Sequence, residues 1–484
     1  MLFGASMSSL TMKRHYANTT LVYQRGVKLF VSSTPSMLRL RIKKLVMAIM
    51  AALFVLVVLR ASIGSSGSGH TYVPNSEPAG FQDLAGSHTV LEPLIIHKNM
   101  EPVPPEEEAR QTEKKPEKKT EVEKKMAKVD PAAPDDVMSM AQPNLLSNFK
   151  NPCWRETNGT ITRVRCLPYF HLIGVDKSGT TDLWYRLSQH PDLVKPNAVL
   201  GKETHWWSWR RFGFDIWVNN ARIQHFNEYL SAFDKPALQI NSTTQASHGI
   251  SDYHQLVTGE GSPTVFWDMT GWNRIPQNND KTVDTALLTP HCIHHLTPKA
   301  KFLIIFRNPT DRLYSDYLFL QLYRAHKKPL TAQSFHTDVQ ESLLMLKQCQ
   351  DHHTLKECLF NKTLHMNIPV RIPVSFYAVY LKEWFKVFPR ENFLILRNED
   401  YSKDIRGHIE KVYNFLEFSK LPDQELNRIA NMSRAYTRNK QHQAAGEMLG
   451  ETRELLNNFH NNLNIDLAQL LQDDRFKWTD PVSK

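Results

Sequence analysis

HLIGVDKSGTTDLWYRL, residues 171–187, joins three kinds of local sequence. A short apolar run leads into a loop that holds a lysine, two glycines and two threonines, and an amphipathic segment follows. This order predicts a buried strand, a loop and a helix. Glycines let a ligand approach the backbone closely, and amides at a helix start attract a phosphate, so the loop is a candidate phosphate site. A plain turn is the alternative.

The loop differs from the common ATP-binding loop in the place of its lysine. In the Walker A pattern the lysine directly follows the second glycine, whereas here it stands two residues before that glycine. The pattern therefore disfavours an ATP loop of that kind. The residues that could contact a phosphate are Lys177, Ser178, Gly179, Thr180 and Thr181.

A second junction of the same kind follows later in the chain. KAKFLIIFRNP, residues 299–309, predicts a buried strand, and DRLYSDYLFLQLYR, residues 311–324, predicts a helix. Proteins that hydrolyse ATP usually end such a strand with an Asp that helps to hold Mg²⁺. Here Arg307 ends the strand, and with Ser315 it offers donors that suit a second phosphate. A structural salt bridge is the alternative for Arg307.

Other segments extend the alternation of strands and helices. ENFLILRNED, residues 391–400, predicts a third strand, and SFYAVYLKEWFKVF, residues 375–388, predicts a helix whose aromatic stripe we interpret as core packing. Short apolar strands that alternate with helices predict an α/β fold with a central, mostly parallel sheet flanked by helices.

The N-terminal part of the chain has the features of a membrane anchor. Residues 1–44 hold eight Lys and Arg and no acidic residue, and fifteen unbroken apolar residues follow at 45–59. We therefore predict a cytoplasmic basic tail over 1–44 and a single transmembrane signal anchor over 45–64, with the rest of the chain in the lumen. A cleaved signal peptide is the alternative.

A spacer separates the predicted anchor from the globular part. Residues 65–150 are rich in Pro, Glu and Lys and poor in aromatics, which predicts a flexible lumenal stem. The globular domain is predicted over 151–484. The basic tail accounts for most of the formal net charge of +10, so we expect no nucleic-acid partner, and an anionic partner must meet a local patch.

All five cysteines follow the predicted anchor, where an oxidising lumen favours disulfides. Proximity in sequence suggests the pairs Cys153–Cys166 and Cys349–Cys358. A zinc site around the second pair is the alternative, and we predict no metal site. Lumenal N-glycosylation sequons stand at Asn158, Asn241, Asn361 and Asn431.

Together these motifs resemble a known family. GVDKSGTT and IIFRNPTDRLYSDY are similar to the two nucleotide-binding motifs of the Golgi carbohydrate sulfotransferases. CWRETNGTITRVRCLPYFHLIG, KETHWWSWRRFG, FYAVYLKEWFKVF, FLILRNEDY and LAQLLQDDRFKW most resemble the members that sulfate N-acetylgalactosamine 4-sulfate at its 6-hydroxyl. The resemblance implies a P-loop-like sulfotransferase fold over 151–484, with 3′-phosphoadenosine-5′-phosphosulfate as co-substrate.

The resemblance also implies roles for single residues. The loop over 177–181 would hold the 5′-phosphosulfate, and Arg307 with Ser315 would hold the 3′-phosphate. Lys202-Glu203-Thr204-His205 matches the family's Lys-Glu-Pro-His element. In that element Glu203 would be the general base, helped by Lys177, Lys202 and His205, and His205 is the alternative base.

Two residues depart from the family pattern, and others are weaker candidates. Asp176 stands where relatives often have proline, and Thr204 replaces the proline after Glu203. The residues we expect to bind the acceptor are Trp207, Arg210 and Arg211, which follow the base closely. We also expect a segment of the chain to close over the nucleotide, and its candidate contact residues are Arg438 and Lys440.

The implied reaction is direct, in-line transfer of a sulfonate to the 6-hydroxyl of N-acetylgalactosamine 4-sulfate in chondroitin or dermatan sulfate, in the Golgi membrane and without a metal. A homodimer is compatible with the resemblance. The alternatives are sulfation of another glycosaminoglycan position, a P-loop kinase or NTPase, and a non-catalytic, membrane-tethered glycan-binding protein.

Overall fold

The computed structural model describes residues 134–198, 200–214, 222–247, 249–321, 330–435 and 444–479, all within one compact unit. The predicted tail, the anchor over 45–64, most of the stem, Arg438 and Lys440 lie outside these residues. Within them, no helix has both the length and the apolar character that a membrane span requires.

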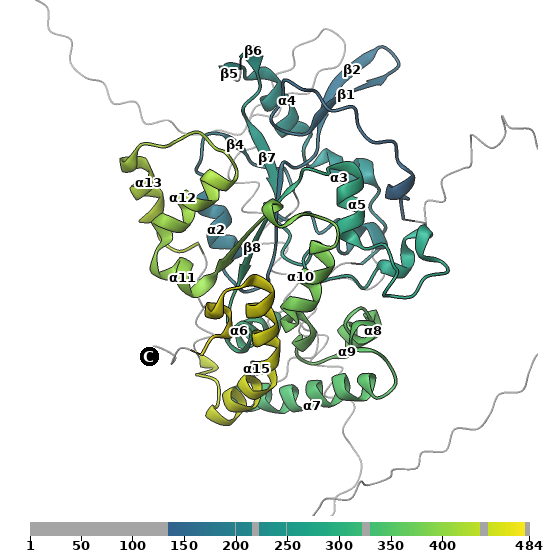
Figure 1. The fold of residues 1–484 in the computed structure, drawn as a ribbon, viewed down its shortest axis with the longest axis vertical. Helices are drawn as coiled ribbons and strands as arrows, with labels where there is room; N and C mark the ends of the chain where they lie inside the picture. The colour runs from purple at the N-terminus through teal and green to yellow at the C-terminus, as the bar shows by residue number, and fades with distance from the viewer. Residues whose placement is uncertain are drawn as a thin grey trace, which may run out of the picture. The chain divides into compact units, whose positions relative to one another are not determined.

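A sheet of five parallel strands forms the centre of the fold, in the order β4-β7-β3-β8-β9 (Figure 1). Its strands are β3 Phe170–Gly174, β4 Leu193–Val194, β7 Val257–Glu260, β8 Lys301–Phe306 and β9 Phe393–Arg397. Every residue of the central strand β3 is buried. The predicted parallel sheet flanked by helices is therefore confirmed.

The connections place a ligand-binding edge at the middle of this sheet. After β3 the chain passes through α2 (Thr180–Leu187) to β4 on one side of β3, whereas β8 and β9 lie on the other side. In open α/β sheets, ligands bind at the carboxyl ends of the strands where the strand order reverses. Here the strand order reverses between β3 and β8. Each of the two sequence motifs begins where one of these strands ends.

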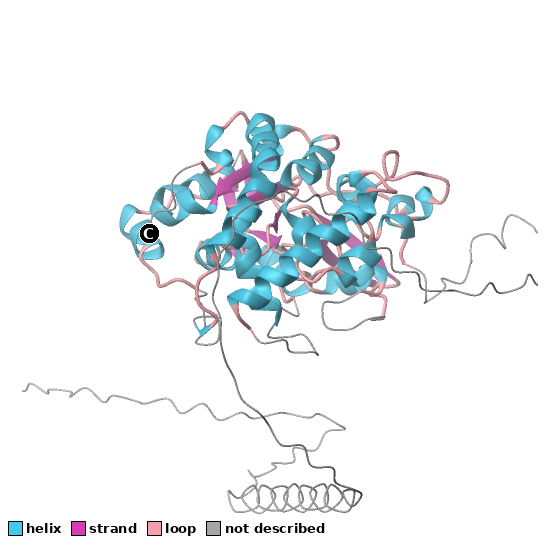
Figure 2. Cartoon of the chain, turned by 90° about the horizontal axis from the view of Figure 1, so that it is seen from below, coloured by secondary structure: helices cyan, strands magenta, loops and turns pink. Residues whose placement is uncertain are grey.

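Helices cover both faces of the sheet (Figures 1 and 2). One face packs against α2, α11 Asn398–Lys403, α12 Ile405–Phe415 and α13 Asp423–Ala430. The core on the other face also contains residues of α3 Phe226–Ser231, α5 Thr289–Leu296, α6 Pro309–Gln321, α7 Ala332–Gln350, α8 Leu355–Leu359, α9 Lys362–Asn367, α10 Tyr377–Phe385 and α15 Gly450–Leu471. Alternate residues of β8 supply the two cores, with Leu303 and Ile305 on the first face and Ile304 on the second.

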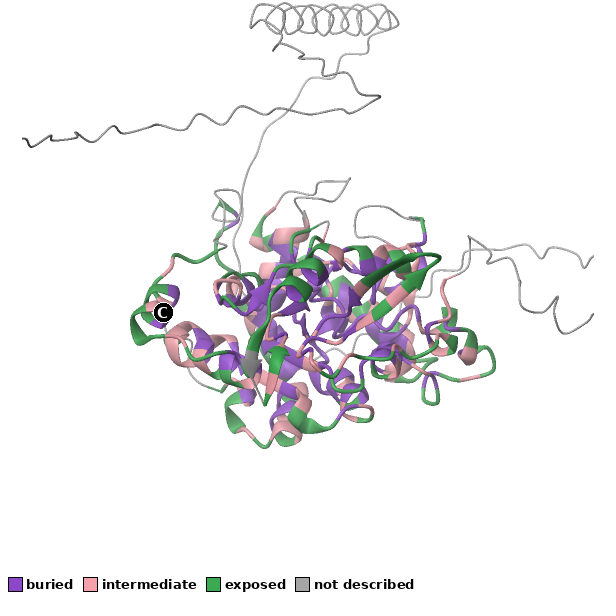
Figure 3. Cartoon of the chain, turned by 90° about the horizontal axis from the view of Figure 1, so that it is seen from above, coloured by how far each residue is buried: buried purple, intermediate pink, exposed green. Residues whose placement is uncertain are grey.

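Smaller elements complete the described part of the chain. Two antiparallel hairpins pair β1 Cys153–Asn158 with β2 Ile161–Cys166, and β5 Gln245–Ser247 with β6 Ile250–Tyr253. Helix α4 spans Asp234–Ser242, and 3-10 turns lie at Val137–Ser139, Arg210–Phe212, Trp272–Arg274, Pro276–Asn278, Ile372–Ser375, Arg390–Asn392 and Asp474–Lys477. Buried residues gather in the interior (Figure 3). They include the whole aromatic stripe predicted as core, Phe376, Tyr380, Trp384 and Phe388.

Two disulfides are present, in the predicted pairing. Cys153–Cys166 closes the β1–β2 hairpin, and Cys349–Cys358 ties the end of α7 to α8. Cys292, the remaining cysteine, is buried and unpaired.

Packed residues also occur N-terminal to Asn151, the predicted start of the domain. Val137 and Phe149 are buried, and Asp135 Oδ1 lies 2.9 Å from His225 Nδ1. The Pro- and Asp-rich composition around these residues hides their apolar contacts, so the packed fold includes the last part of the predicted stem.

The four sequon asparagines differ in exposure. Asn158, Asn241 and Asn431 are exposed, whereas Asn361 is half-buried. Its side-chain oxygen accepts a hydrogen bond from the Leu364 amide at 3.1 Å and so caps α9. Glycosylation at the four sites stays a prediction.

Candidate active site

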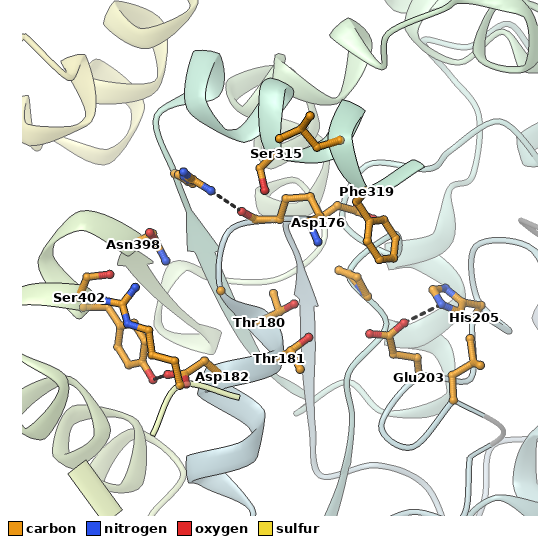
Figure 4. Close-up of a pocket in the computed structure, with 18 of the residues that line it drawn as sticks. Asp176, Thr180, Thr181, Asp182, Glu203, His205, Ser315, Phe319, Asn398 and Ser402 are labelled. Carbon is orange, nitrogen blue, oxygen red and sulfur yellow. Dashed lines mark hydrogen bonds and ion pairs between the residues drawn. The ribbon is translucent and has the colours of Figure 1, made fainter. Parts of the chain in front are cut away.

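A pocket of about 650 Å³ lies at the carboxyl edge of the sheet. Groups from all five strand ends line it: Lys177, Gly179, Thr180 and Thr181 after β3, Glu203 and His205 after β4, Pro263 after β7, Arg307 and Ser315 after β8, and Asn398 after β9. In Figure 4, Glu203 and His205 lie on one side of Thr180 and Thr181, and Asn398 lies on the other.

Glycine is required at the last residue of β3 and at the residue before α2. A Cβ atom on Gly174 would lie 2.8 Å from Phe266 Cβ, inside normal contact. Gly179 has φ +100°, and a Cβ there would lie 2.6 Å from Asn398 Nδ2. That same amide nitrogen donates to the Ser178 carbonyl at 2.7 Å. The end of β9 therefore fixes the loop against the start of α2.

Lys177 is a half-buried cation of this loop. Burial lowers the pKa of its ammonium to about 8, although Asp316 and Asp176 favour the charged form. Its Nζ lies 3.9 Å from the centre of the Phe319 ring, at the pocket wall. A bound anion would stabilise the charged form of Lys177 further.

Asp176, which departs from the family pattern, has a structural role. Its Oδ2 accepts a hydrogen bond from Trp267 Nε1 at 2.6 Å, and its Oδ1 lies 3.4 Å from Arg371 Nη2. Arg371 Nε also donates to Asp316 Oδ2 at 2.8 Å. Arg312 Nη1 also lies 3.4 Å from Asp316 Oδ2, so two guanidinium groups accompany the two carboxylates.

Arg307 connects the second motif to the first. Its Nη1 donates to the Lys177 carbonyl at 3.2 Å, while Tyr377 donates its hydroxyl to the Arg307 carbonyl at 3.1 Å. Ser315 lies further along α6 and lines the same pocket. The two junctions that sequence patterns identified separately thus face one cavity.

Glu203 forms the centre of a polar cluster on the loop after β4. Lys202 Nζ pairs with Glu203 Oε1 and donates to the Gly261 carbonyl at 2.6 Å. His205 Nε2 lies 2.9 Å from Glu203 Oε2, and its Nδ1 lies 3.0 Å from Thr264 Oγ1 (Figure 4). The His205 ring also stacks on Trp209 at 4.7 Å between ring centres. The carboxylate is therefore held by one partner on each oxygen.

The charge state of Glu203 follows from these contacts. Burial acts to raise the pKa of its carboxyl, but Lys202 first and then His205 bring it down to about 2. The group is ionised at neutral pH and able to accept a proton. A base of such low pKa is weak, and efficient proton transfer requires a pKa nearer to the working pH.

Changing Lys202 to methionine should make this effect measurable. Loss of the ammonium removes the largest influence that lowers the Glu203 pKa, so that pKa rises. Because the base must be unprotonated, the acid limb of kcat/KM should move to higher pH in Lys202→Met than in the wild-type protein. A pH–rate profile with Lys299→Met as the control tests this, and an unmoved acid limb contradicts it.

Glu260, at the end of β7, forms hydrogen bonds that fix the same loop. It is fully buried, and its Oε1 accepts from the Thr204 hydroxyl at 3.0 Å and also from the Ser262 hydroxyl. Ser262 Oγ in turn accepts from the His205 amide at 2.8 Å. Thr204, the second departure from the family pattern, thus replaces the stiffness of proline with a hydrogen bond to a buried carboxylate.

The family described as Sulfotransferase domain matches residues 168–473, which include all of these groups. The chain belongs to the sulfotransferase family.

Curated relatives of this sulfotransferase carry more specific names. It is 36% identical over 324 residues to carbohydrate sulfotransferase 15 of Rattus norvegicus, and likewise to that of Homo sapiens, in each case covering 66% of this chain and 56% of the relative. The chain therefore spans little more than half the length of these relatives. A solved sulfotransferase from Alicyclobacillus acidocaldarius is 22% identical, with a TM-score of 0.39, over 65% of this chain and 99% of that one.

In this sulfotransferase the three predicted acceptor residues lie in the core. Trp207, Arg210 and Arg211 are all buried, and none lines the pocket. Trp207 donates to the Tyr229 hydroxyl at 3.0 Å, and Arg211 donates to the Trp207 carbonyl and the Thr289 hydroxyl, each at 3.0 Å. The aromatic run after Glu203 turns into the core, and of residues 206–211 only Trp209 lines the pocket.

The end of the third strand supplies residues that the motifs did not indicate. Asn398, Tyr401 and Ser402 line the pocket from the segment that follows β9. Tyr401 donates its hydroxyl to Asp182 Oδ2 at 2.6 Å, joining this segment to α2. A usable signal was present, since polar residues directly follow a predicted parallel strand.

The pocket has the character of a site for a doubly anionic ligand. Ser178 Oγ is fully buried and has no hydrogen-bond partner within the described ranges. Ser178 does not itself line the pocket, whereas Lys177, Thr180 and Thr181 do, and they offer an anion a charged donor and two hydroxyl groups at a helix start. Arg307 and Ser315 offer donors for a second anionic group. No group of three or more His, Cys, Asp and Glu suited to a metal occurs in the part of the chain that the structure covers.

Proposed function

We propose that the chain transfers a sulfonate from 3′-phosphoadenosine-5′-phosphosulfate to the 6-hydroxyl of N-acetylgalactosamine 4-sulfate in chondroitin or dermatan sulfate. The observation that supports this most is the shared pocket, which brings an ionised carboxylate, Glu203, together with two cationic junctions at Lys177 and Arg307. The names of the relatives support a carbohydrate acceptor.

The residues of the two junctions fit this donor. The loop residues Lys177, Ser178, Gly179, Thr180 and Thr181 would hold its 5′-phosphosulfate, and all of them except Ser178 line the pocket. Arg307 and Ser315 would hold its 3′-phosphate. When bound, the donor supplies an activated sulfonate and a phosphate leaving group.

The chain's own groups account for the transfer. Glu203 takes the proton of the acceptor hydroxyl while that oxygen forms its bond to sulfur and the bond between sulfur and the bridging oxygen breaks. Lys177 and the loop amides stabilise the negative charge that develops on the bridging oxygen. Lys202 and His205 orient the transferring group from either side of Glu203. No covalent enzyme intermediate is needed.

The proposal includes the topology inferred from the sequence. Residues 45–64 would anchor the protein in the Golgi membrane as a single-pass type II protein. The stem would carry the catalytic domain into the lumen, where disulfides are stable.

The role of Arg307 can be tested with the nucleotide product and with an analogue that lacks the 3′-phosphate. In Arg307→Met, binding of adenosine 3′,5′-bisphosphate should weaken by about 10- to 100-fold, the value of a hydrogen bond to a charged group. Binding of adenosine 5′-phosphate should stay unchanged, because that ligand has no 3′-phosphate. Calorimetry with Arg390→Met as the control, an arginine at the amino end of β9, measures both. Equal losses for the two ligands contradict the assignment.

The proposed reaction is tested by an acceptor panel with product analysis. The full chain is incubated with labelled donor and with 4-sulfated, 6-sulfated or unsulfated chondroitin, dermatan sulfate and heparan sulfate, and the products are digested to disaccharides. We expect 4,6-disulfated N-acetylgalactosamine from the 4-sulfated acceptors. New sulfate at another position would replace the proposed specificity, and no transfer to any acceptor would reject the proposed reaction.

A further inference from the structure

A second cavity adjoins the pocket described above. This groove, of about 820 Å³, shares Thr181, Leu200, Glu203 and Arg434 with the pocket. It continues from there along α2 and the end of β4, past Tyr185 and Lys195. Glu203 is therefore one of the groups at which the two cavities meet.

The groove carries excess positive charge. Its charged lining residues are Lys195, Lys202, Glu203 and Arg434, and two of these, Lys202 and Glu203, pair with each other. Lys195 and Arg434 are exposed, and neither forms an ion pair with any residue that the structure describes. Two uncompensated cations thus border a cavity that ends at the proposed base.

Arg434 is held at the groove by contacts of its neighbours with α2. Arg186, fully buried, donates from Nη2 to the Met432 carbonyl at 2.8 Å and from Nη1 to the Ile429 carbonyl at 2.7 Å. The Ala435 amide donates to Asp182 Oδ1 at 3.0 Å. The backbone on both sides of Arg434 is therefore fastened to the helix that forms the groove wall.

Apolar surface accompanies the charges. The side chains of Tyr185 and Leu200 are 41% and 43% exposed, and both line the groove. Aromatic rings bury large area at little entropic cost and pack against the apolar faces of sugar rings. Cations beside an exposed ring suit an anionic sugar chain better than a neutral one.

We propose that this groove is the acceptor site and takes an anionic glycan. Lys195 and Arg434 pair with sulfate or carboxylate groups on the sugar units next to the one whose hydroxyl reaches Glu203. The inference rests on the proposed function for its reaction. It assigns recognition of the acceptor to Lys195 and Arg434. The sequence had instead suggested the residues that directly follow Glu203.

The first test compares KM values for the acceptor. Since an exposed ion pair is worth about 0.2–1 kcal/mol, Lys195→Ala/Arg434→Ala should raise the KM for 4-sulfated chondroitin by up to about 25-fold, with Lys195→Ala alone contributing up to about 5-fold. Lys195 lines only the groove, so Lys195→Ala should leave the donor KM unchanged. The control, Lys299→Ala/Lys382→Ala, removes two exposed charges outside both cavities. An acceptor KM equal to that of the control overturns the proposal.

Binding of two modified acceptors, measured without turnover, identifies the anion. Unsulfated chondroitin retains only carboxylates, and carboxyl-reduced 4-sulfated chondroitin retains only sulfates. The acceptor on which the variant and the control behave alike lacks the group that the cations recognise. If the double variant is weaker than the control on both acceptors, one cation is assigned to each group. If it is weaker on no acceptor, the proposal is overturned.

Binding without turnover separates this proposal from the proposed function. Binding of a 4-sulfated chondroitin oligosaccharide to the full chain is measured at several salt concentrations, in wild type, the double variant and the control. Weaker, less salt-dependent binding in the double variant alone supports the groove even if wild type transfers no sulfonate. Transfer by wild type, together with unchanged binding in the double variant, rejects the groove and leaves the proposed reaction standing.

Discussion

Replacing Glu203 by glutamine should lower kcat by about 10²–10⁴-fold, the usual contribution of a general base. The amide keeps the shape of the side chain and a hydrogen-bonding oxygen, but it cannot take the proton of the acceptor hydroxyl. Affinity for adenosine 3′,5′-bisphosphate should change little, because the donor contacts lie at the other strand ends. Steady-state kinetics and calorimetry on the same preparation measure both quantities.

The control for this substitution is Glu391→Gln. Glu391 is exposed and precedes β9, at the opposite edge of the sheet from the pocket. The Glu391→Gln variant should retain full activity. If Glu203→Gln kept a kcat near that of this control, Glu203 would not be the base, and His205, which lies 2.9 Å from it, would become the candidate.

Replacing Lys177 by methionine should lower kcat/KM by about 10²–10³-fold, the range measured when one donor to a developing oxyanion is removed. Lys177 differs from the other donors in its titration. Since burial lowers its pKa to about 8, the free protein loses this charge as the pH rises through that value.

The pH dependence of product binding isolates this effect. Anion binding requires the charged form of Lys177, so wild-type affinity for adenosine 3′,5′-bisphosphate should fall above pH 8, by up to about tenfold for each pH unit. Lys177→Met should bind weakly and show no such fall. An identical fall in both proteins would place the titrating group elsewhere.

The sequence predicted the parts of the site that local patterns determine. The strand, loop and helix at 171–187 were readable because apolar runs, glycines and helix periodicity depend on neighbouring residues. Arg307 was found by the same rule, since it ends an apolar strand. The pocket then follows from parallel pairing, which brings the carboxyl ends of β3 and β8 to one edge.

Features that depend on tertiary packing were not predictable in this way. Trp207 and Arg211 follow Glu203 closely in sequence, yet their side chains enter the core beside α3 and α5. Lys195 and Arg434 lie far apart in the chain and meet at one groove because α2 anchors the segment around Arg434. Linear proximity to Glu203 therefore does not show which cations line the groove.

The most direct test of the proposed single-step transfer measures donor consumption and product formation together. The full chain is mixed with labelled 3′-phosphoadenosine-5′-phosphosulfate, with and without 4-sulfated chondroitin. We predict one adenosine 3′,5′-bisphosphate released for each sulfonate transferred, only when acceptor is present, and no label on the protein. Release of bisphosphate without transfer, label retained on the protein, or no turnover with any glycosaminoglycan would contradict the proposed single-step transfer.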